Sequence, residues 1–363
     1  MKMHELTEDF KREQLEREKH HYERYIGEGA RPEVLFDVYN KVKRLEDWPK
    51  EFGVIGEKIE KSADSVKDNT VRALMYLEAI LYRHLGSLAI FEDTEEKKKL
   101  YYDSLEAYKK AASYFWAPAE RIEFPFKKTT LKGFFRKSPK AASKKSPCII
   151  SLHGADASGL VEGHYMTNFI LDKGMHTIEF DLPGQYEARF EGMYMVPEEF
   201  EKGVAAAIDY LGTRQEVDSG KIGLIGSSFG GYIAARVAAF EKRLKAVVSC
   251  GGFYGMDEFT YMWGAVLHLQ NDMNVSKEQW PETLKNYTLA GIIDKITCPL
   301  LVVNGTADAT SPNSQVVKIY DNAKCPKDLK LYDGAGHSAW YWKKSALTDI
   351  ADWFWVKLNG KHV

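Results

Sequence analysis

Hydrophobic residues in the first 116 positions recur at intervals of three and four. The stretches VRALMYLEAILYRHLGSLAIF and YYDSLEAYKKAASYF show this spacing most clearly. Such spacing places apolar side chains on one face of an α-helix, so it predicts a series of amphipathic helices. The region contains no recognisable catalytic motif. We therefore predict an all-helical module over residues 1–116.

After residue 116 the pattern changes to short apolar runs separated by helix-length segments. The segments ERIEFPF and LKGFFR alternate between apolar and polar positions, which is typical of a β-hairpin. Six short runs follow: CIISLHG, HTIEFD, KIGLIG, KAVVSC, PLLVVNG and KLYDG. Nearly continuous apolar strands separated by helices indicate a parallel sheet that is buried on both faces. The predicted fold is α/β, a doubly wound and mostly parallel sheet over residues 117–363.

A long segment at about residues 253–296 interrupts this alternation. It is aromatic and apolar, and it is too long for a plain connection between a strand and a helix. We expect a helical, cap-like insertion over the carboxyl ends of the strands, where such sheets bind their ligands. Trp263 in this segment, together with Trp340 and Tyr341, could line a cavity there or pack in the core.

Composition and charge exclude several classes of partner. A chain of 363 residues fits one large domain with a smaller one. Its net charge of -2 gives no bulk attraction to nucleic acids or anionic membranes. No window holds the roughly 18 uninterrupted apolar residues of a membrane span, and the charged N-terminus does not resemble a signal peptide.

The cysteines point to no metal site. None of the four is paired at the CxxC spacing that zinc sites use, so we expect no bound metal. Buried, reduced thiols fit a cytoplasmic protein. The four are Cys148, Cys250, Cys298 and Cys325.

The segment KIGLIGSSFGGY contains the pattern G-x-S-x-G between a predicted strand and a predicted helix. Of its two serines, only Ser228 has glycines two positions before and after it, at Gly226 and Gly230. A serine at a sharp strand-to-helix turn needs such glycines, because a Cβ at either position would collide with its neighbours. Ser228 is the predicted nucleophile. The alternative, a dinucleotide-binding turn, requires G-x-G-x-x-G in the first βαβ unit, and two strand–helix units precede this one.

A serine hydroxyl needs a base, and that base needs an acid to orient it. Asp308 follows the run PLLVVNG, and His337 follows KLYDG. In hydrolases built on such sheets the order is serine, acid, histidine. Since both residues follow strand ends, the three side chains can meet at one edge of the sheet. The alternatives are a loop aspartate and a structural histidine; Asp333 is expected only to shape the turn before His337.

An oxyanion hole requires two backbone N–H groups. The N–H of Phe229, directly after the nucleophile, is the first candidate. The second is Ala155 in the turn after CIISLHG, with Asp156 as the other choice. His153 is expected to hold this loop rather than to carry protons.

With these residues in this order, the chain resembles the α/β-hydrolase superfamily. The motifs that carry the resemblance are LHGADAS, FDLPGQYE, GSSFGGY, VNGTAD and DGAGHS. The helical module, the junction WAPAER, the turn FDLPGQ and the segment CGGF are similar to the 2,6-dihydroxypseudooxynicotine hydrolase type. That type has relatives among fungal hydrolases that shorten polyketide pigments.

The resemblance implies hydrolysis of a carbon–carbon bond next to a carbonyl, as in a β-diketone or an acylated phenol. It implies an N-terminal helical cap, a cavity for a small-molecule substrate beneath it, homodimers and no cofactor. It also implies an additional acid after the sixth strand, for which Glu258 or Asp257 is the candidate; the alternative is a surface carboxylate that starts a helix. A carboxylesterase or thioesterase with the same three residues stays open, as does a non-catalytic binding protein of this fold.

Overall fold

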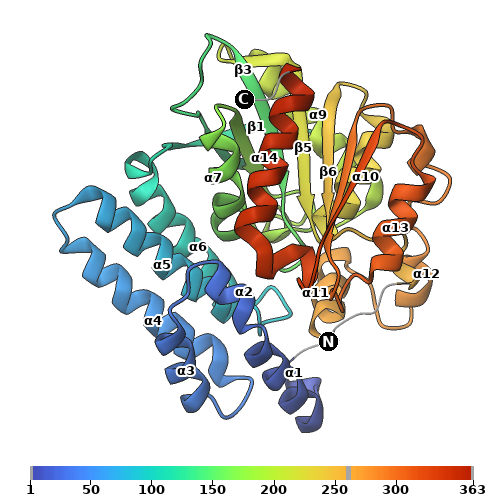
Figure 1. Ribbon diagram of the computed structural model, residues 1–363. Coiled ribbons are helices and arrows are strands. Elements are labelled where there is room, and N and C mark those ends of the chain that lie inside the picture. The colour runs from blue at the N-terminus through green and yellow to red at the C-terminus, as the bar shows by residue number, and fades with distance from the viewer. Residues whose placement is uncertain (1–2, 259–262, 361–363) are drawn as a thin grey trace.

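The computed structural model describes residues 3–258 and 263–360. Its N-terminal part is a layer of helices, drawn in blue to cyan in Figure 1, that lies beside the sheet-containing body. Threonine and aspartate side chains cap the first turns of α1, α5 and α6, at Thr7, Asp68 and Thr94. The elements are η1 (Met3–Glu5), α1 (Glu8–His20), α2 (Tyr22–Gly27), α3 (Pro32–Lys41), α4 (Asp47–Asp64), α5 (Asn69–Ser87), α6 (Glu95–Ala111) and η2 (Ala112–Tyr114).

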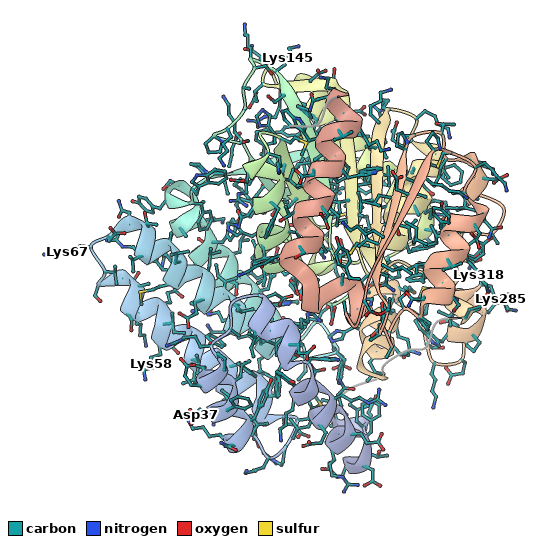
Figure 2. All side chains as sticks on the ribbon, viewed as in Figure 1. Asp37, Lys58, Lys67, Lys145, Lys285 and Lys318 are labelled. Atoms are coloured by element: carbon teal, nitrogen blue, oxygen red, sulfur yellow. The ribbon has the colours of Figure 1, made fainter. Side chains whose placement is uncertain are left out.

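This helical module has a hydrophobic core of its own. Trp48 of α4 is fully buried, and its indole N–H donates to the carbonyl of Leu85 in α5 at 2.8 Å. Its ring contacts those of Tyr39 and Phe52. Many charged side chains of the module face solvent, as Figure 2 shows for the labelled Asp37, Lys58 and Lys67. The module ends at Tyr114 and the first strand begins at Ala119, and we propose the domain boundary between them.

Eight strands form one sheet in the order β1-β2-β4-β3-β5-β6-β7-β8. The hairpin β1–β2 joins the sheet in antiparallel fashion, and all strands from β4 to β8 pair in parallel. The predicted α/β class with a mostly parallel sheet is therefore confirmed. The strands are β1 (Ala119–Phe126), β2 (Thr129–Arg136), β3 (Ser146–Leu152), β4 (His176–Phe180), β5 (Val217–Ser227), β6 (Leu244–Cys250), β7 (Leu300–Gly305) and β8 (Lys327–Tyr332).

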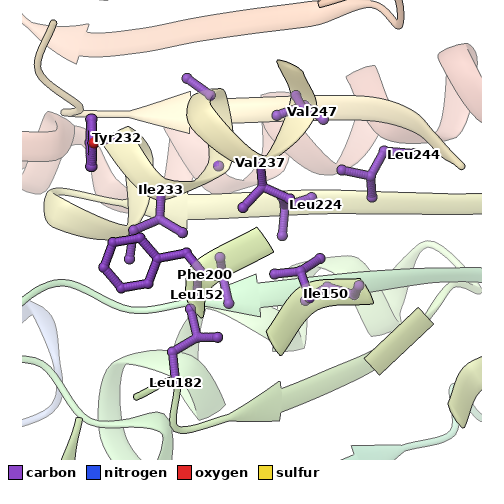
Figure 3. Packing of buried hydrophobic residues seen from close by; sticks show 14 of the residues in the cluster. Ile150, Leu152, Leu182, Phe200, Leu224, Tyr232, Ile233, Val237, Leu244 and Val247 are labelled. Atoms are coloured by element: carbon purple, nitrogen blue, oxygen red, sulfur yellow. The ribbon is translucent and has the colours of Figure 1, made fainter. Parts of the chain in front are cut away.

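Helices cover both faces of this sheet. Successive strand residues point to opposite faces, so Ile150 packs in one hydrophobic cluster and Ile149 in another. Figure 3 shows the first cluster, which includes Phe200 and Ile233 from the helices and Leu224 from β5. The helices of this face are α9 (Pro197–Thr213), α10 (Phe229–Phe240) and α13 (Asn313–Asn322), and those of the other are α7 (His164–Asp172) and α14 (Lys343–Asn359).

The segment between β6 and β7 is helical where it is described. It contains η4 (Met256–Glu258), α11 (Trp263–Met273), α12 (Trp280–Leu284) and η5 (Ile293–Lys295). Two further short helices, η3 (Gly159–Gly163) and α8 (Tyr186–Phe190), follow β3 and β4, and η6 (His337–Trp342) follows β8. Among the described helices, none has both the length and the apolar character that crossing a membrane requires.

Loss of the Trp48 side chain should destabilise the helical module strongly. Trp48→Ala removes a large buried ring and leaves a cavity, so we expect the free energy of unfolding to fall by about 3–5 kcal/mol. Urea denaturation followed by circular dichroism measures this change. Leu74→Ala is the control, because 61% of Leu74 is exposed and such surface changes stay within about 0.5 kcal/mol. Equal effects of the two substitutions would contradict a core centred on Trp48.

Candidate active site

Ser228 occupies a sharp turn between β5 and α10. Its backbone angles are φ 57° and ψ -121°, a conformation that is costly for a residue with a Cβ. The neighbouring glycines make this turn possible. A Cβ on Gly226 would lie 1.9 Å from the carbonyl oxygen of Gly230, and a Cβ on Gly230 would lie 2.6 Å from that of Leu152. The glycine spacing that singled out Ser228 therefore has a direct steric cause.

The structure brings Ser228, His337 and Asp308 together at the carboxyl ends of β5, β7 and β8. Nε2 of His337 lies 2.8 Å from Oγ of Ser228, and Nδ1 of His337 lies 2.8 Å from Oδ2 of Asp308. The other carboxylate oxygen of Asp308 accepts the backbone N–H groups of Thr310 and Ser311, at 2.7 and 2.8 Å. With Oδ1 bound to two amides, Oδ2 is directed to the histidine.

A second set of hydrogen bonds holds the turns that carry Asp308 and His337. The N–H of Ser338 donates to the side-chain oxygen of Asn304 at 3.2 Å, and the amide of Asn304 donates to the carbonyl of Ser311 at 2.9 Å. Ser338 and Ala339 have positive φ angles, which turn the chain directly after His337. Sequence reasoning missed Asn304 and Ser338, although Asn304 stands in the quoted motif VNGTAD. In the turn before His337, Asp333 accepts a hydrogen bond from the hydroxyl of Thr306 at 3.2 Å.

The two expected oxyanion-hole residues both adjoin Ser228. Phe229 is the first residue of α10, and its ring packs in the core against Phe200 and Tyr232. The loop after β3 also passes directly over the serine, since a Cβ on Gly154 would lie 3.1 Å from Cβ of Ser228. Ala155 follows in that loop and lines the cavity described below.

His153 is buried at the start of this loop. Its Nε2 lies 3.1 Å from Oδ1 of Asp181, and the hydroxyl of Tyr101 in α6 donates to Oδ2 of Asp181 at 2.9 Å. Burial lowers the pKa of His153, but bonding to Asp181 outweighs it and the pKa is raised. The helical module thus reaches the loop through a charged hydrogen-bond chain.

Glu258 does not reach the site. It lies on the surface with 44% of its side chain exposed, where it pairs with Lys318 and accepts from Gln315 at 3.3 Å. Figure 2 shows Lys318 at the outer edge of the molecule. Asp257 is exposed as well. The expectation of an additional acid at this position is therefore corrected, because the short helix η4 turns both carboxylates outward and presents the buried Met256 to the interior.

A cavity of about 380 Å³ lies over Ser228 and His337, between the helical module and the sheet. Most of its wall is apolar and comes from Met166, Phe253, Met256, Leu269, Leu347 and Ile350. Its polar lining includes His21, Glu23, Arg24, Asp156 and Glu162. The side chains of Trp263, Trp340 and Tyr341 lie outside the described residues. Within residues 3–258 and 263–360, no group of three His, Cys, Asp or Glu side chains is placed to hold a metal ion.

Arg24 of α2 forms ion pairs with two carboxylates of this polar lining. It binds Oδ2 of Asp156 and Oε1 of Glu162, each at 2.6 Å. Nε2 of His84 in α5 lies 3.2 Å from the same oxygen of Glu162. Burial alone would raise the pKa of Asp156, but the guanidinium of Arg24 lowers it to about 2. The pKa of Glu162 is likewise well below its ordinary value, because His84 and Arg24 outweigh the effect of burial.

A second buried group of charges lies behind the loop and was not apparent from the sequence. It contains Lys97, His268 and Asp272, each less than a tenth exposed. Burial raises the pKa of Asp272 to about 7 and lowers that of Lys97. These residues border a small pocket that Ala155 and Asp156 also line. His268 and Asp272 share a face of α11, but Lys97 comes from α6, far away in the chain, so the sequence does not connect the three.

Comparisons with known proteins agree with this architecture. The prolyl oligopeptidase family matches residues 197–361. The 2,6-dihydropseudooxynicotine hydrolase of Paenarthrobacter nicotinovorans is 30% identical over 247 residues, which are 64% of this chain and 63% of the relative. Hydrolyase poxO of Penicillium oxalicum is 26% identical over 251 residues, covering 56% of this chain and 59% of the relative. The alignments thus span less than two thirds of either relative.

The similarity in structure extends further along the chain. The crystal structure of a 2,6-dihydroxy-pseudo-oxynicotine hydrolase superposes with a TM-score of 0.83 at 24% sequence identity, covering 94% of this chain and 97% of the other. The likeness includes the helical module as well as the sheet. The strand order, the serine turn and this likeness show that the chain has the α/β-hydrolase fold.

Proposed function

We propose that the protein is a serine hydrolase that cleaves a carbon–carbon bond next to a carbonyl group in a small, largely apolar substrate. The observation that carries the proposal is the hydrogen-bonded chain from Ser228 through His337 to Asp308, at 2.8 Å for each link, beneath a cavity lined mostly by apolar side chains. This is the geometry that converts a serine hydroxyl into a nucleophile.

In the first half of the reaction, Oγ of Ser228 attacks the substrate carbonyl and Nε2 of His337 takes its proton. The N–H groups of Phe229 and Ala155 hold the developing oxyanion. Asp308 keeps Nδ1 of His337 protonated and stabilises the imidazolium. The carbon–carbon bond then breaks, and the leaving carbon, stabilised as an enolate or as a phenol-like carbanion, receives the proton from His337.

In the second half, a water molecule attacks the acyl group on Ser228 while His337 takes a proton from it. The acid is released and the serine is protonated again. For a β-diketone the balance is one diketone and one water converted to one carboxylic acid and one ketone. No oxidant, reductant or cofactor enters this balance.

Two observations favour a small aromatic or polyketide-like substrate. The cavity of about 380 Å³ can hold a molecule of one or two rings, and its apolar wall matches such surfaces. The chain is also similar to 2,6-dihydropseudooxynicotine hydrolase over 247 residues. Because the alignment covers only part of that relative, the similarity supports the bond type rather than a particular substrate.

Removing the nucleophile should abolish turnover. Ser228→Ala is expected to lower kcat by about 10⁴- to 10⁶-fold, on the scale of other triads. The matched control is Ser227→Ala, which removes the neighbouring hydroxyl and should change kcat by less than tenfold. Steady-state kinetics on an aryl ester or diketone measures both. Turnover by Ser228→Ala at a rate near that of the wild type would refute the assignment.

The bond type is tested by comparing two substrates. Benzoylacetone, an aryl β-diketone, should be hydrolysed to acid and ketone in a reaction that Ser228→Ala abolishes. The ester p-nitrophenyl butyrate, whose nitrophenolate is a far better leaving group than an enolate, serves as the positive control for an activated serine. Loss of the diketone absorbance and chromatography of the acid and ketone products follow the reaction. Ser228-dependent turnover of the ester without cleavage of benzoylacetone would identify an esterase instead.

Asp308 should stabilise the fold in a pH-dependent way. Burial would raise its pKa, but His337 and the backbone amides outweigh this effect and the pKa is lowered. A lowered folded pKa gives stability that is present above the unfolded value of about 3.9 and is lost as the pH falls through the folded value. The difference in free energy of unfolding between wild type and Asp308→Asn should therefore be larger at pH 5 than at pH 3. Urea titrations at both pH values measure it, and the opposite order would contradict the lowered pKa.

A further inference from the structure

We infer that Arg24, in the N-terminal helical module, is a positioning residue for the oxyanion-binding loop 153–158. Its guanidinium holds this loop so that the N–H of Ala155 faces the carbonyl attacked by Ser228. The inference rests on the proposed function, because it assigns a role in the same reaction. It means that the helical module completes the catalytic site and does more than enclose the substrate.

From the sheet side the loop is held at its start, where the amide of Gln185 donates to the carbonyl of His153 at 3.3 Å and Nε2 of His153 lies 3.1 Å from Oδ1 of Asp181. It leaves β3 at Leu152 and passes over Ser228 so closely that a Cβ on Gly154 would be 3.1 Å from that of the serine. Ala155 borders the large cavity on one side and the small polar pocket on the other. A loop between two hollows needs bonds at its ends to keep one amide in place.

Arg24 supplies those bonds on the C-terminal side of Ala155. One arm of the guanidinium binds Asp156, the next residue of the loop, at 2.6 Å. The other arm binds Glu162 at 2.6 Å, and the second oxygen of Glu162 accepts the N–H of Ser158, at the end of the loop, at 2.8 Å. A planar guanidinium can hold two carboxylates in fixed directions at once, which a lysine ammonium cannot do.

Tyr186 of α8, in the sheet domain, and His84 of the module support the same part of the loop. The hydroxyl of Tyr186 lies 3.3 Å from the carbonyl oxygen of Asp156 and 3.2 Å from Nδ1 of His84. His84 in turn bonds Glu162, so α5 supports the carboxylate that Arg24 binds. The arginine and Glu162 side chains are only 10% and 6% exposed. Solvent therefore competes weakly for these bonds.

The helix that carries Arg24 also lies beside the catalytic histidine. Residues of α2 contact η6, the short helix that begins at His337. In Figure 1, α2 lies below the end of α14, next to this part of the chain. One short helix therefore touches both the segment with the proposed base and, through Arg24, the loop with the proposed oxyanion donor.

The test uses a fluorescent ethyl fluorophosphonate, which reacts with an activated serine whatever the natural substrate is. Oγ of Ser228 bonds to phosphorus, fluoride leaves, and His337 takes the serine proton; the phosphoryl oxygen occupies the oxyanion hole. Arg24→Met keeps the apolar stem and removes the guanidinium. We expect the maximal rate of labelling to fall by about 10- to 100-fold, because a displaced oxyanion donor costs this much. The concentration for half-maximal rate should change by less than threefold.

Arg83→Met is the matched control. Arg83 of α5 is also buried and pairs with Glu60 of α4, so its loss breaks a comparable ion pair inside the module while the bonds of Arg24 to Asp156 and Glu162 stay in place. It should lower the melting temperature without slowing the labelling. Arg24→Lys keeps the charge and should recover part of the rate. If Arg24→Met does not fold, Arg24→Met/Asp156→Asn removes the unpaired loop carboxylate, and the same loss of rate is expected.

The outcomes separate the two proposals. Labelling of the wild type that Ser228→Ala does not abolish would overturn the serine mechanism. Ser228-dependent labelling that proceeds equally fast in wild type and Arg24→Met would overturn the role of Arg24 and leave the serine mechanism intact. An equal slowing by Arg24→Met and Arg83→Met would assign the effect to general loosening of the module, which also overturns the inference.

Discussion

The close approach of backbone to backbone around Ser228 is the constraint on which the rest of the site depends. The left-handed backbone of this serine is possible only because residues 226 and 230 carry no Cβ, and the strand β3 then runs within contact distance of the turn. This contact sets the loop 153–158 against Ser228. The order of the central strands then places the ends of β7 and β8, and with them Asp308 and His337, at the same edge of the sheet.

The features that the sequence predicts well are those whose cause is local. A run of apolar residues makes a buried strand wherever it stands, and a serine between two glycines needs them for steric reasons within one turn. The strands, the order of the three site residues and the position of Ser228 follow from such signals. The outward position of Glu258 does not, because it depends on the direction in which the short helix η4 leaves the strand and on the presence of Lys318, 60 residues later.

The buried ion pairs of Arg24 could not be predicted from the sequence for the same reason. The local pair of Arg24 with Glu28, four residues later, is an ordinary feature of a helix; what distinguishes Arg24 is contact with residues more than 130 positions away. Such pairs are costly to bury singly and stable only together. A single sequence contains no signal that pairs Arg24 with Asp156 and Glu162. Asn304 is an intermediate case. It stands in a visible motif, but its role depends on its hydrogen bonds to the backbone of Ser311 and Ser338, which the sequence does not show.

Arg24 and the carboxylates it binds come from separate parts of the chain. Because each is costly to bury without the other, these residues are constrained to change together. The apolar residues that line the cavity can change one at a time and alter which molecule fits. Substitution of Arg24, in contrast, leaves the buried carboxylates of Asp156 and Glu162 without their arginine partner. Exchange of the helical module between homologous enzymes should therefore succeed only when the loop after β3 is transferred with it. The helical module and the loop after β3 therefore form one structural unit, and we expect homologues to exchange them together.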